Sequence, residues 1–174
     1  MLQNINFKFL GKYADIANAL KKAKVVSHFW KILCIAPIIG VLEGRTSSNG
    51  KSSEESATVF SEQMNDYYDE IIFAFRIVML LNPVKTLDEK KEDAFKYYCK
   101  VDDEEKNKRV KDNFDLFKAY LFGGLDVLYE ELLEGNIDNN NNIKDREEYF
   151  RKSSKYIKKL CKSEEIIKLN ENLF

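Results

Sequence analysis

The sequence predicts an all-α protein, a single helical bundle of about six or seven helices with two long central antiparallel helices. Gly and Pro number only 7 and 2, whereas many β-rich folds need frequent turns built from these residues. Hydrophobic residues make up 44% of the chain, and in several long stretches they recur at three- and four-residue spacing. The length of 174 residues is typical of one domain. We therefore predict one domain over residues 1–174, with flexible loops near 44–53 and 135–143.

Apolar spacing predicts two elements in the first quarter of the chain. A stripe with steps of four and three predicts a helix over Phe7–Lys24. In the apolar stretch Val25–Leu42 that follows, Pro37 is expected to end, kink or begin a helix. A buried strand over Ile32–Val41 is the alternative, although no partner strand is evident. The charge-free residues 32–42 are too few for the roughly 20 that cross a bilayer, so we expect a core segment and no membrane partner.

Two long helices are predicted from matched apolar stripes. The first, Ser53–Asn82, opens with a capping-box pattern of Ser52 and Glu55. The second, Asp102–Glu134, begins at a capping aspartate and stops before Gly135. Because each helix must bury its stripe, we predict that the two pack against each other in antiparallel fashion.

Shorter elements complete the predicted chain. Thr86 and Glu89 form a second capping-box pattern, which predicts a helix to about Lys100. The Asn-rich residues 136–142 predict a loop. A helix over Asp145–Cys161 follows, and a short last helix is predicted from Ser163 to residue 169.

Gly123 and Gly124 lie inside the second long helix. Each costs about 1 kcal/mol relative to Ala in a helix interior. The pair therefore indicates a kink or a close helix crossing, and a ligand site is the alternative.

The polar segment from Gly44 to Ser52 resembles a phosphate-binding P-loop. In that motif four residues separate the two glycines. Five residues separate Gly44 from Gly50 here, and no later apolar strand ends in a magnesium-binding Asp. We therefore expect a flexible loop with no nucleotide.

Asp138, Asn140 and Asn142 resemble the opening of an EF-hand calcium loop. Such a loop requires Gly at position six and Glu at position twelve. These positions are Ile143 and Tyr149, so we expect an Asn-rich turn.

Clustered carboxylates raise the alternative of a metal-dependent all-α hydrolase. Glu62, Asp66 and Glu70 follow i, i+4 spacing. All-α nucleotide pyrophosphatases hold magnesium with E-x-x-E and E-x-x-D pairs on adjacent helices. Glu89 and Glu92 match the first pair, whereas the best second pair, Asp112 with Asp115, departs from the pattern. Nearby lysines favour ordinary salt bridges on a solvated face, so we expect neither a metal nor another cofactor.

The reactive side chains are few. His28 is the only histidine and lies in an apolar run, so a core or interface histidine is expected rather than a catalytic base. Cys34 and Cys99 lack a neighbouring base and are expected to be buried hydrophobes. Three cysteines without a secretory signal favour a reducing compartment, and a cytoplasmic location is the expectation.

The charge distribution is polarised, although the net charge is only -1. Residues 1–31 carry a clear basic excess, and residues 54–70 carry six acidic residues and no basic one. A second basic segment contains six cations and no acid: Arg151, Lys152, Lys155, Lys158, Lys159 and Lys162. Phe150, Ser154, Ile157 and Cys161 share one face of this helix, which we expect to be buried, leaving the cations exposed.

The segments of opposite charge either neutralise one another within one bundle or guide association with a partner. We expect a non-catalytic protein-interaction or assembly module, such as an accessory subunit of a larger intracellular complex, with a protein partner or self-association. A nucleic-acid-binding protein that uses residues 1–31 and 151–162 is the first alternative. The hydrolase described above is the second.

Overall fold

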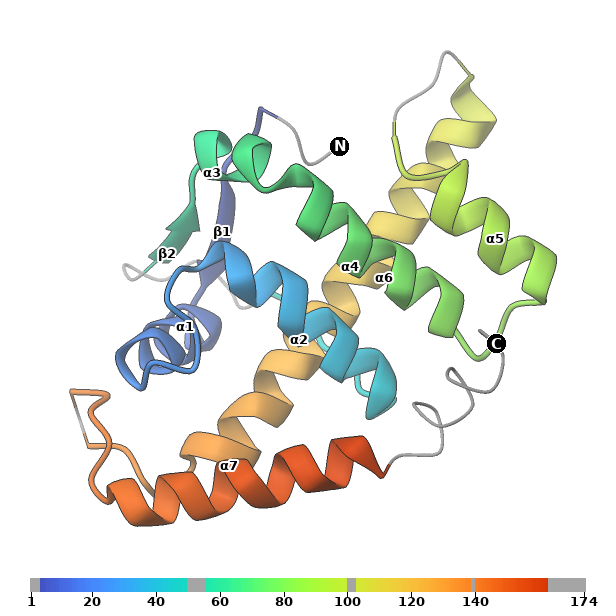
Figure 1. The fold of residues 1–174 in the computed structure, drawn as a ribbon. Helices are drawn as coiled ribbons and strands as arrows, with labels where there is room; N and C mark the ends of the chain where they lie inside the picture. The colour runs from blue at the N-terminus through green and yellow to red at the C-terminus, as the bar shows by residue number, and fades with distance from the viewer. Residues whose placement is uncertain (1–3, 50–55, 100–102, 139, 163–174) are drawn as a thin grey trace.

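The computed structural model describes residues 4–49, 56–99, 103–138 and 140–162. The chain is 66% helical with seven α-helices in the described ranges, so the predicted all-α class is confirmed (Figure 1). The elements in chain order are β1 (Phe7–Leu10), α1 (Lys12–Lys22), α2 (Trp30–Leu42), β2 (Ser56–Val59), α3 (Ser61–Asp66), α4 (Tyr68–Leu81), α5 (Leu87–Phe95), α6 (Glu104–Leu128), the π-helix η1 (Tyr129–Leu133) and α7 (Arg146–Cys161).

Two short strands stand where the sequence predicted helix. β1 and β2 pair antiparallel, with Phe7 opposite Val59 (Figure 1). The helices predicted to start at residues 7 and 53 therefore start at Lys12 and Ser61. Burial alternates along both strands, which is the two-residue period of a strand, and Gly11 with a φ of 57° separates β1 from α1. The predicted capping box at residues 52 and 55 lies outside the described residues.

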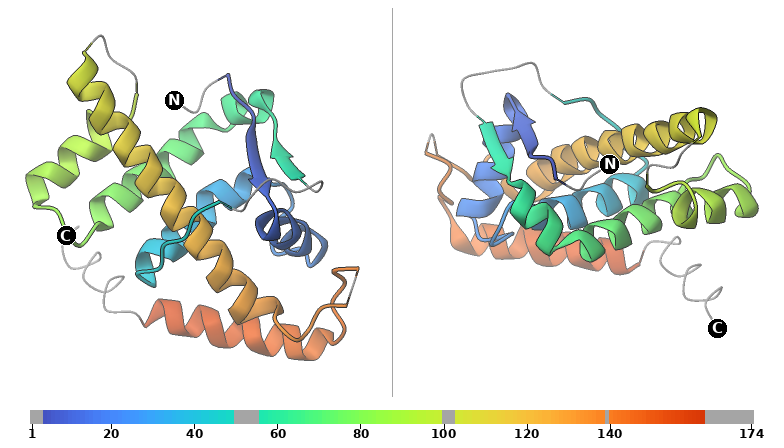
Figure 2. Two further views of the ribbon diagram at one scale, coloured as in Figure 1. Left: turned by 180° about the vertical axis from the view of Figure 1, so that it is seen from behind. Right: turned by 90° about the horizontal axis from the view of Figure 1, so that it is seen from above.

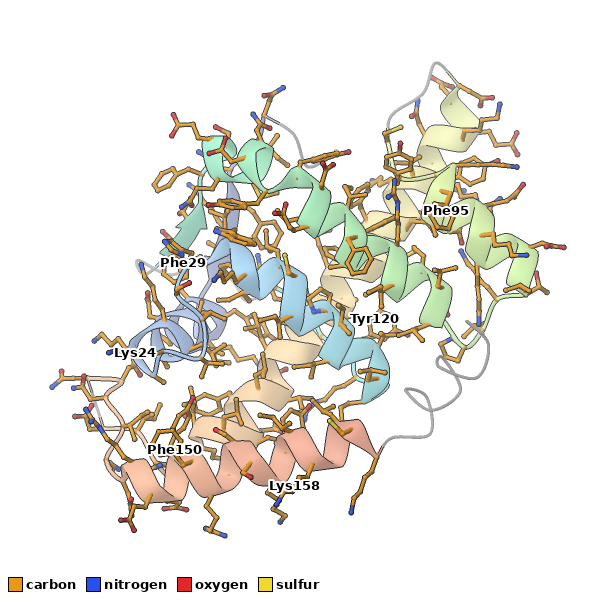
Figure 3. The ribbon with its side chains drawn as sticks, in the orientation of Figure 1. Lys24, Phe29, Phe95, Tyr120, Phe150 and Lys158 are labelled. Atoms are coloured by element: carbon orange, nitrogen blue, oxygen red, sulfur yellow. The ribbon has the colours of Figure 1, made fainter. Side chains whose placement is uncertain are left out.

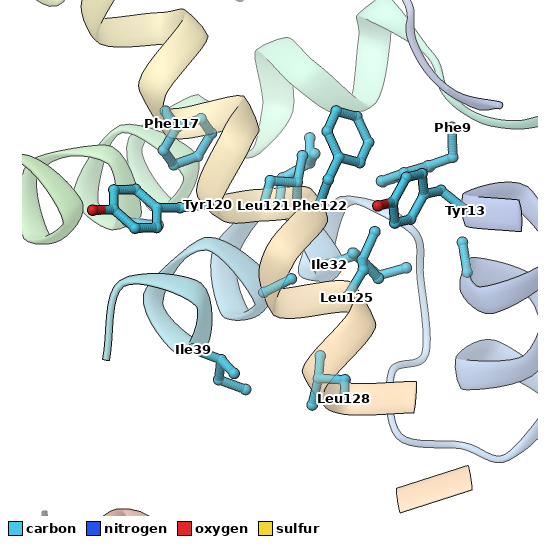
Figure 4. Packing of buried hydrophobic residues seen from close by; sticks show 14 of the residues in the cluster. Phe9, Tyr13, Ile32, Ile39, Phe117, Tyr120, Leu121, Phe122, Leu125 and Leu128 are labelled. Carbon is cyan, nitrogen blue, oxygen red and sulfur yellow. The ribbon is translucent and has the colours of Figure 1, made fainter. Parts of the chain in front are cut away.

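The centre of the fold is the crossing of α2 with α6. α2 packs most extensively on α6 and also packs on α4. Figure 4 shows Ile32 of α2 beside Leu125 of α6. Residues 30–42 are thus a helix rather than the alternative strand, and Pro37 lies inside it, neither ending nor beginning it.

Glycines allow this crossing to be close. A Cβ atom at Gly124 would lie 1.8 Å from the carbonyl oxygen of Ala36, and one at Gly40 would lie 2.0 Å from the carbonyl oxygen of Tyr120. The backbones of α2 and α6 therefore touch where neither helix carries a side chain, which confirms the predicted close crossing. On another side of α6, a Cβ at Gly123 would lie 2.0 Å from the carbonyl oxygen of Arg45.

The predicted contact between the two long helices is present, with α2 as a further partner of both. Phe75 of α4 stacks on Phe114 of α6, with ring centroids 4.7 Å apart. The first long helix is divided at Tyr67, whose ring stacks on Trp30 at 3.8 Å. α2 packs more extensively on α4 and on α6 than these two helices pack on each other.

Most predicted helix ends lie close to the observed ones. The capping box of Thr86 and Glu89 opens α5, which ends at residue 95 rather than 100. Asp103 caps α6, while the predicted cap at residue 102 lies outside the described residues. Gly135, with a φ of 75°, follows the end of the second long helix, whose last turn is the π-helix η1. The last predicted helix, residues 163–169, also lies outside the described residues.

Candidate functional site on helix α7

Helix α7 lies along one end of the molecule, drawn in red at the bottom of Figure 1 and of the left view of Figure 2. Asp145 caps its first turn by accepting hydrogen bonds from the backbone N–H groups of Glu147 and Glu148. The buried Asn136 donates to the backbone carbonyl of Asp145 at 2.7 Å and accepts from its N–H at 2.9 Å. These bonds fix where the helix starts.

One face of α7 packs on the bundle. Tyr156 is buried, and Tyr149 and Leu160 are half-buried. Burial raises the pKa of Tyr156, whose hydroxyl lies 3.5 Å from Glu43 at the end of α2. Lys159 donates to the same carboxylate at 3.0 Å, and this hydrogen bond raises the pKa of Lys159. α7 is therefore held by a tyrosine-rich face together with Lys159.

The face that the sequence predicted to be buried is exposed, so that prediction is wrong. Phe150 is 67% exposed, Ile157 is 59% exposed, and Ser154 and Cys161 are exposed as well. The reason is a second set with identical spacing, one residue earlier: Tyr149, Ser153, Tyr156 and Leu160. We call Phe150, Ser154, Ile157 and Cys161 the apolar stripe.

The six cations of residues 151–162, five on α7 and Lys162 directly after it, divide into two groups. Lys159 contacts Glu43 and Glu131 of the bundle, and Lys152 donates to the backbone carbonyl of Glu134 at 2.7 Å. The other four are exposed, and Lys158 points away from the bundle (Figure 3). This basic stripe comprises Arg151, Lys155, Lys158 and Lys162.

The four cations of the basic stripe differ in their ion pairs. Arg151 approaches Glu148 within 3.7 Å. Within the described ranges, no carboxylate pairs with Lys155, Lys158 or Lys162. At about 100° per residue, the basic stripe lies directly beside the apolar stripe, away from the buried face.

A recess lies at the start of α7, where the two basic segments of the sequence meet. Its volume is about 470 Å³, and Lys22, Lys24, Arg146, Tyr149 and Phe150 are among the residues that line it. Figure 3 shows Lys24 and Phe150 on the same side of the molecule. The apolar stripe therefore ends in a basic hollow with aromatic walls.

The described part of the acidic segment lies at the opposite end of the molecule, on α3 and the start of α4 (Figures 1 and 2). Glu62, Asp66, Asp69 and Glu70 are exposed there and form no ion pair within the described ranges. Phe60 and Phe73, 57% and 62% exposed, flank these carboxylates in sequence. We call these six residues the acidic face. The neutralisation of charged segments within one bundle does not take place between this face and α7.

Glu89 and Glu92, the best-matching pair considered for a metal site, have local partners instead. Glu89 accepts hydrogen bonds from Thr86 within its own capping box. Glu92 pairs with Lys96 and Arg109, at 3.1 Å each. In the described part of the chain, no three His, Cys, Asp or Glu side chains are placed to hold a metal ion.

The other candidate residues are the histidine and two of the cysteines. His28 is exposed beside Ser27, so the core alternative of that prediction is wrong and the interface alternative stays a prediction. Cys34 and Cys99 are half-buried rather than buried, and burial raises the pKa of Cys34 to about 11.

The two segments that resemble an EF-hand loop and a P-loop have other local contacts. In the EF-hand-like segment, Asp138 accepts hydrogen bonds from the backbone N–H groups of Asn140 and Asn142, as in an Asn-rich turn. In the P-loop-like segment, the backbone N–H of Ser47 donates to Ala119 of α6 at 2.9 Å, and residues 50–53 lie outside the described residues.

Comparison with known proteins found no matching family model, no similar curated protein and no similar solved structure. None of the described helices has the length and apolar character needed to span a membrane. We therefore infer function from the surfaces of this chain.

The charged segments could be located from the sequence, but the residues that lie beside them in the fold could not. The basic recess joins residues more than 120 positions apart, and no local pattern announces it. The acidic run was visible in the sequence, but the exposure of Phe60 and Phe73 beside it was not predicted. The sequence signal for an exposed apolar stripe was the presence of two stripes with the same spacing on α7. The bundle covers only one of them, so the other stays exposed.

Proposed function

We propose that the protein is a non-catalytic protein-interaction or assembly module that docks its partner on the apolar and basic stripes of α7. Large apolar side chains such as Phe150 and Ile157 gain about 25 cal/mol for each Å² removed from water. We expect a partner surface to cover them, since the bundle packs on the neighbouring face of the helix and leaves the apolar stripe exposed.

The basic stripe defines the chemistry of that partner. Lys155, Lys158 and Lys162 border the apolar stripe on one side and favour carboxylates opposite them. The partner is therefore a protein surface with apolar side chains bordered by acidic residues, consistent with an accessory subunit of a larger complex. The single observation that carries the proposal is the exposure of a helix stripe with the spacing of a packed face.

Site-specific photo-crosslinking in cells tests the proposal. A photoreactive phenylalanine analogue at Ser154 lies within the apolar stripe, and the same analogue at the exposed Lys111 of α6 serves as the control. We expect a protein adduct from position 154 but not from position 111. Reversing Lys155, Lys158 and Lys162 to Glu should remove most of the adduct. An adduct formed only within the same chain, to residues 163–174, would contradict the proposal. So would an adduct whose yield is unchanged by the charge reversal.

Nucleic-acid binding is the second candidate, favoured by the recess. Lys22, Lys24 and Arg146 surround the rings of Tyr149 and Phe150, and stacking with phosphate contacts is how single strands are bound. A fluorescently labelled oligonucleotide titrated at several salt concentrations tests it, because each phosphate contact steepens the salt dependence. Binding lost in Lys22→Glu/Arg146→Glu would favour this candidate, and no binding at low salt would exclude it.

A further inference from the structure

We propose that a second copy of this chain is the partner docked on α7, with the acidic face of one molecule covering the apolar and basic stripes of the next. This inference rests on the proposed docking role of α7 and names the occupant. It starts from two surfaces of opposite charge, on which Lys155, Lys158, Lys162 and the four carboxylates form no ion pair with any described residue.

The chemistry of the two surfaces is complementary. On α7, Lys155, Lys158 and Lys162 border Phe150 and Ile157. On the acidic face, four carboxylates lie between Phe60 and Phe73. Each surface thus offers apolar side chains for burial and charges that the other one satisfies, the arrangement that guides encounter and fixes register at interfaces.

The dimensions of the two surfaces also agree. The 16 residues of α7 make a helix about 24 Å long, and residues 61–73 span at most about 20 Å at 1.5 Å per residue. The recess beside Phe150 accommodates an aromatic side chain bordered by carboxylates, because Lys22, Lys24 and Arg146 line it. Phe60, two residues before Glu62, has this character.

The opposite positions of the two surfaces determine the type of assembly. A two-fold dimer through α7 alone would bring the basic stripes of two copies together, and like charges opposite each other are unfavourable. Because α7 and the acidic face lie at opposite ends of one molecule (Figures 1 and 2), the contact is head-to-tail. Such a contact builds a ring or an open chain rather than a closed dimer.

Sedimentation velocity of the full chain over a range of concentrations and salt tests this inference. The wild-type protein should associate, more weakly at high salt because exposed charges are screened. Lys155→Glu/Lys158→Glu/Lys162→Glu should weaken association at least about tenfold. The matched control Lys91→Glu/Lys108→Glu/Lys111→Glu makes the same charge change at exposed or unpaired lysines of α5 and α6 and should leave association unchanged.

The decisive experiment reverses the charges of both surfaces, each in a separate variant, and mixes the two variants. Glu62→Lys/Asp66→Lys/Asp69→Lys should weaken association to a similar extent. Mixing it with the α7 reversal should restore association, since each surface again meets its opposite. A wild-type protein that stays monomeric at high concentration overturns the inference, as does a mixture that fails to associate while both variants keep the wild-type unfolding transition. A Ser154 crosslink to a different protein would then leave the proposed docking function standing without self-association.

Discussion

Helices α6 and α7 carry apolar residues at the same three- and four-residue spacing, with opposite fates. In α6, Phe114, Phe117 and Leu121 are buried, with α2 and α4 packed on the helix. In α7, Phe150 and Ile157 remain in water while the neighbouring stripe of Tyr149 and Tyr156 faces the bundle. Spacing establishes that residues share a helix face. Whether the same chain covers that face depends on the number of neighbouring helices, which no local pattern contains.

The difference also separates the residues that maintain the fold from those available for interaction. α6 has neighbours on several sides, including a backbone-to-backbone contact at Gly124. α7 contacts the bundle along one side only. Substitutions in α6 should therefore change stability, whereas substitutions on the exposed side of α7 should change association.

The largest expected effect is on stability, from a matched pair of truncations. Leu121→Ala should lower the free energy of unfolding by about 2–5 kcal/mol because Leu121 is fully buried and a cavity remains. Ile157→Ala should change it by less than about 0.5 kcal/mol, since exposed positions contribute little. Urea unfolding of dilute protein measures both values. Equal losses at the two positions would remove the distinction between the helices.

The next effect tests the close crossing of α6 with α2. Gly124→Ala should destabilise the protein by about 3 kcal/mol, since its Cβ would lie 1.8 Å from the carbonyl oxygen of Ala36 and helix backbones yield poorly to overpacking. Gly44→Ala is the control, with a φ of 61° and open space around the new Cβ, and should cost about 1 kcal/mol. Thermal and urea unfolding measure both. A neutral Gly124→Ala would contradict the described crossing.

A buried charge should contribute more to the free energy of unfolding than the exposed charges of α7. The buried Asp93 bonds with Lys85, with Arg109 at 2.7 Å and with Asn113 at 3.0 Å. Burial alone would raise the pKa of Asp93, but these hydrogen bonds outweigh it and lower the pKa below the ordinary 3.8. Their contribution to stability is therefore complete above pH 3.8 and is lost as the pH falls through the lower folded-state pKa.

Asp93→Asn should accordingly cost about 2 kcal/mol at pH 7. The difference from wild type should shrink below pH 3.8, as measured by urea unfolding across pH. The reversal of Lys155, Lys158 and Lys162 should cost less than about 0.5 kcal/mol at pH 7. A pH-independent cost of Asp93→Asn would show that the carboxylate charge contributes nothing.

Most helices were predictable from the sequence because their signals are local. The capping box of Thr86 and Glu89 and the stop at Gly135 act within one helical turn. The pairing of β1 with β2 was not predictable, because it joins residues about 50 positions apart and each strand has only four residues. For the candidate site, the cations of α7 were found and the face beside them was misassigned. The face with Tyr149 and Tyr156 has the same spacing as the face with Phe150 and Ile157. Only tertiary packing determines which of the two faces is buried.

Hydroxyl-radical footprinting at increasing protein concentration tests most directly whether the apolar stripe is exposed in one molecule and covered by another. We predict strong oxidation of Phe150 and Ile157 in dilute protein and parallel protection of these residues and of Phe60 and Phe73 as concentration rises. Leu87 and Phe95, 63% and 54% exposed on α5, should be oxidised equally throughout. Protection of Phe150 and Ile157 at every concentration, or at none, would contradict the account.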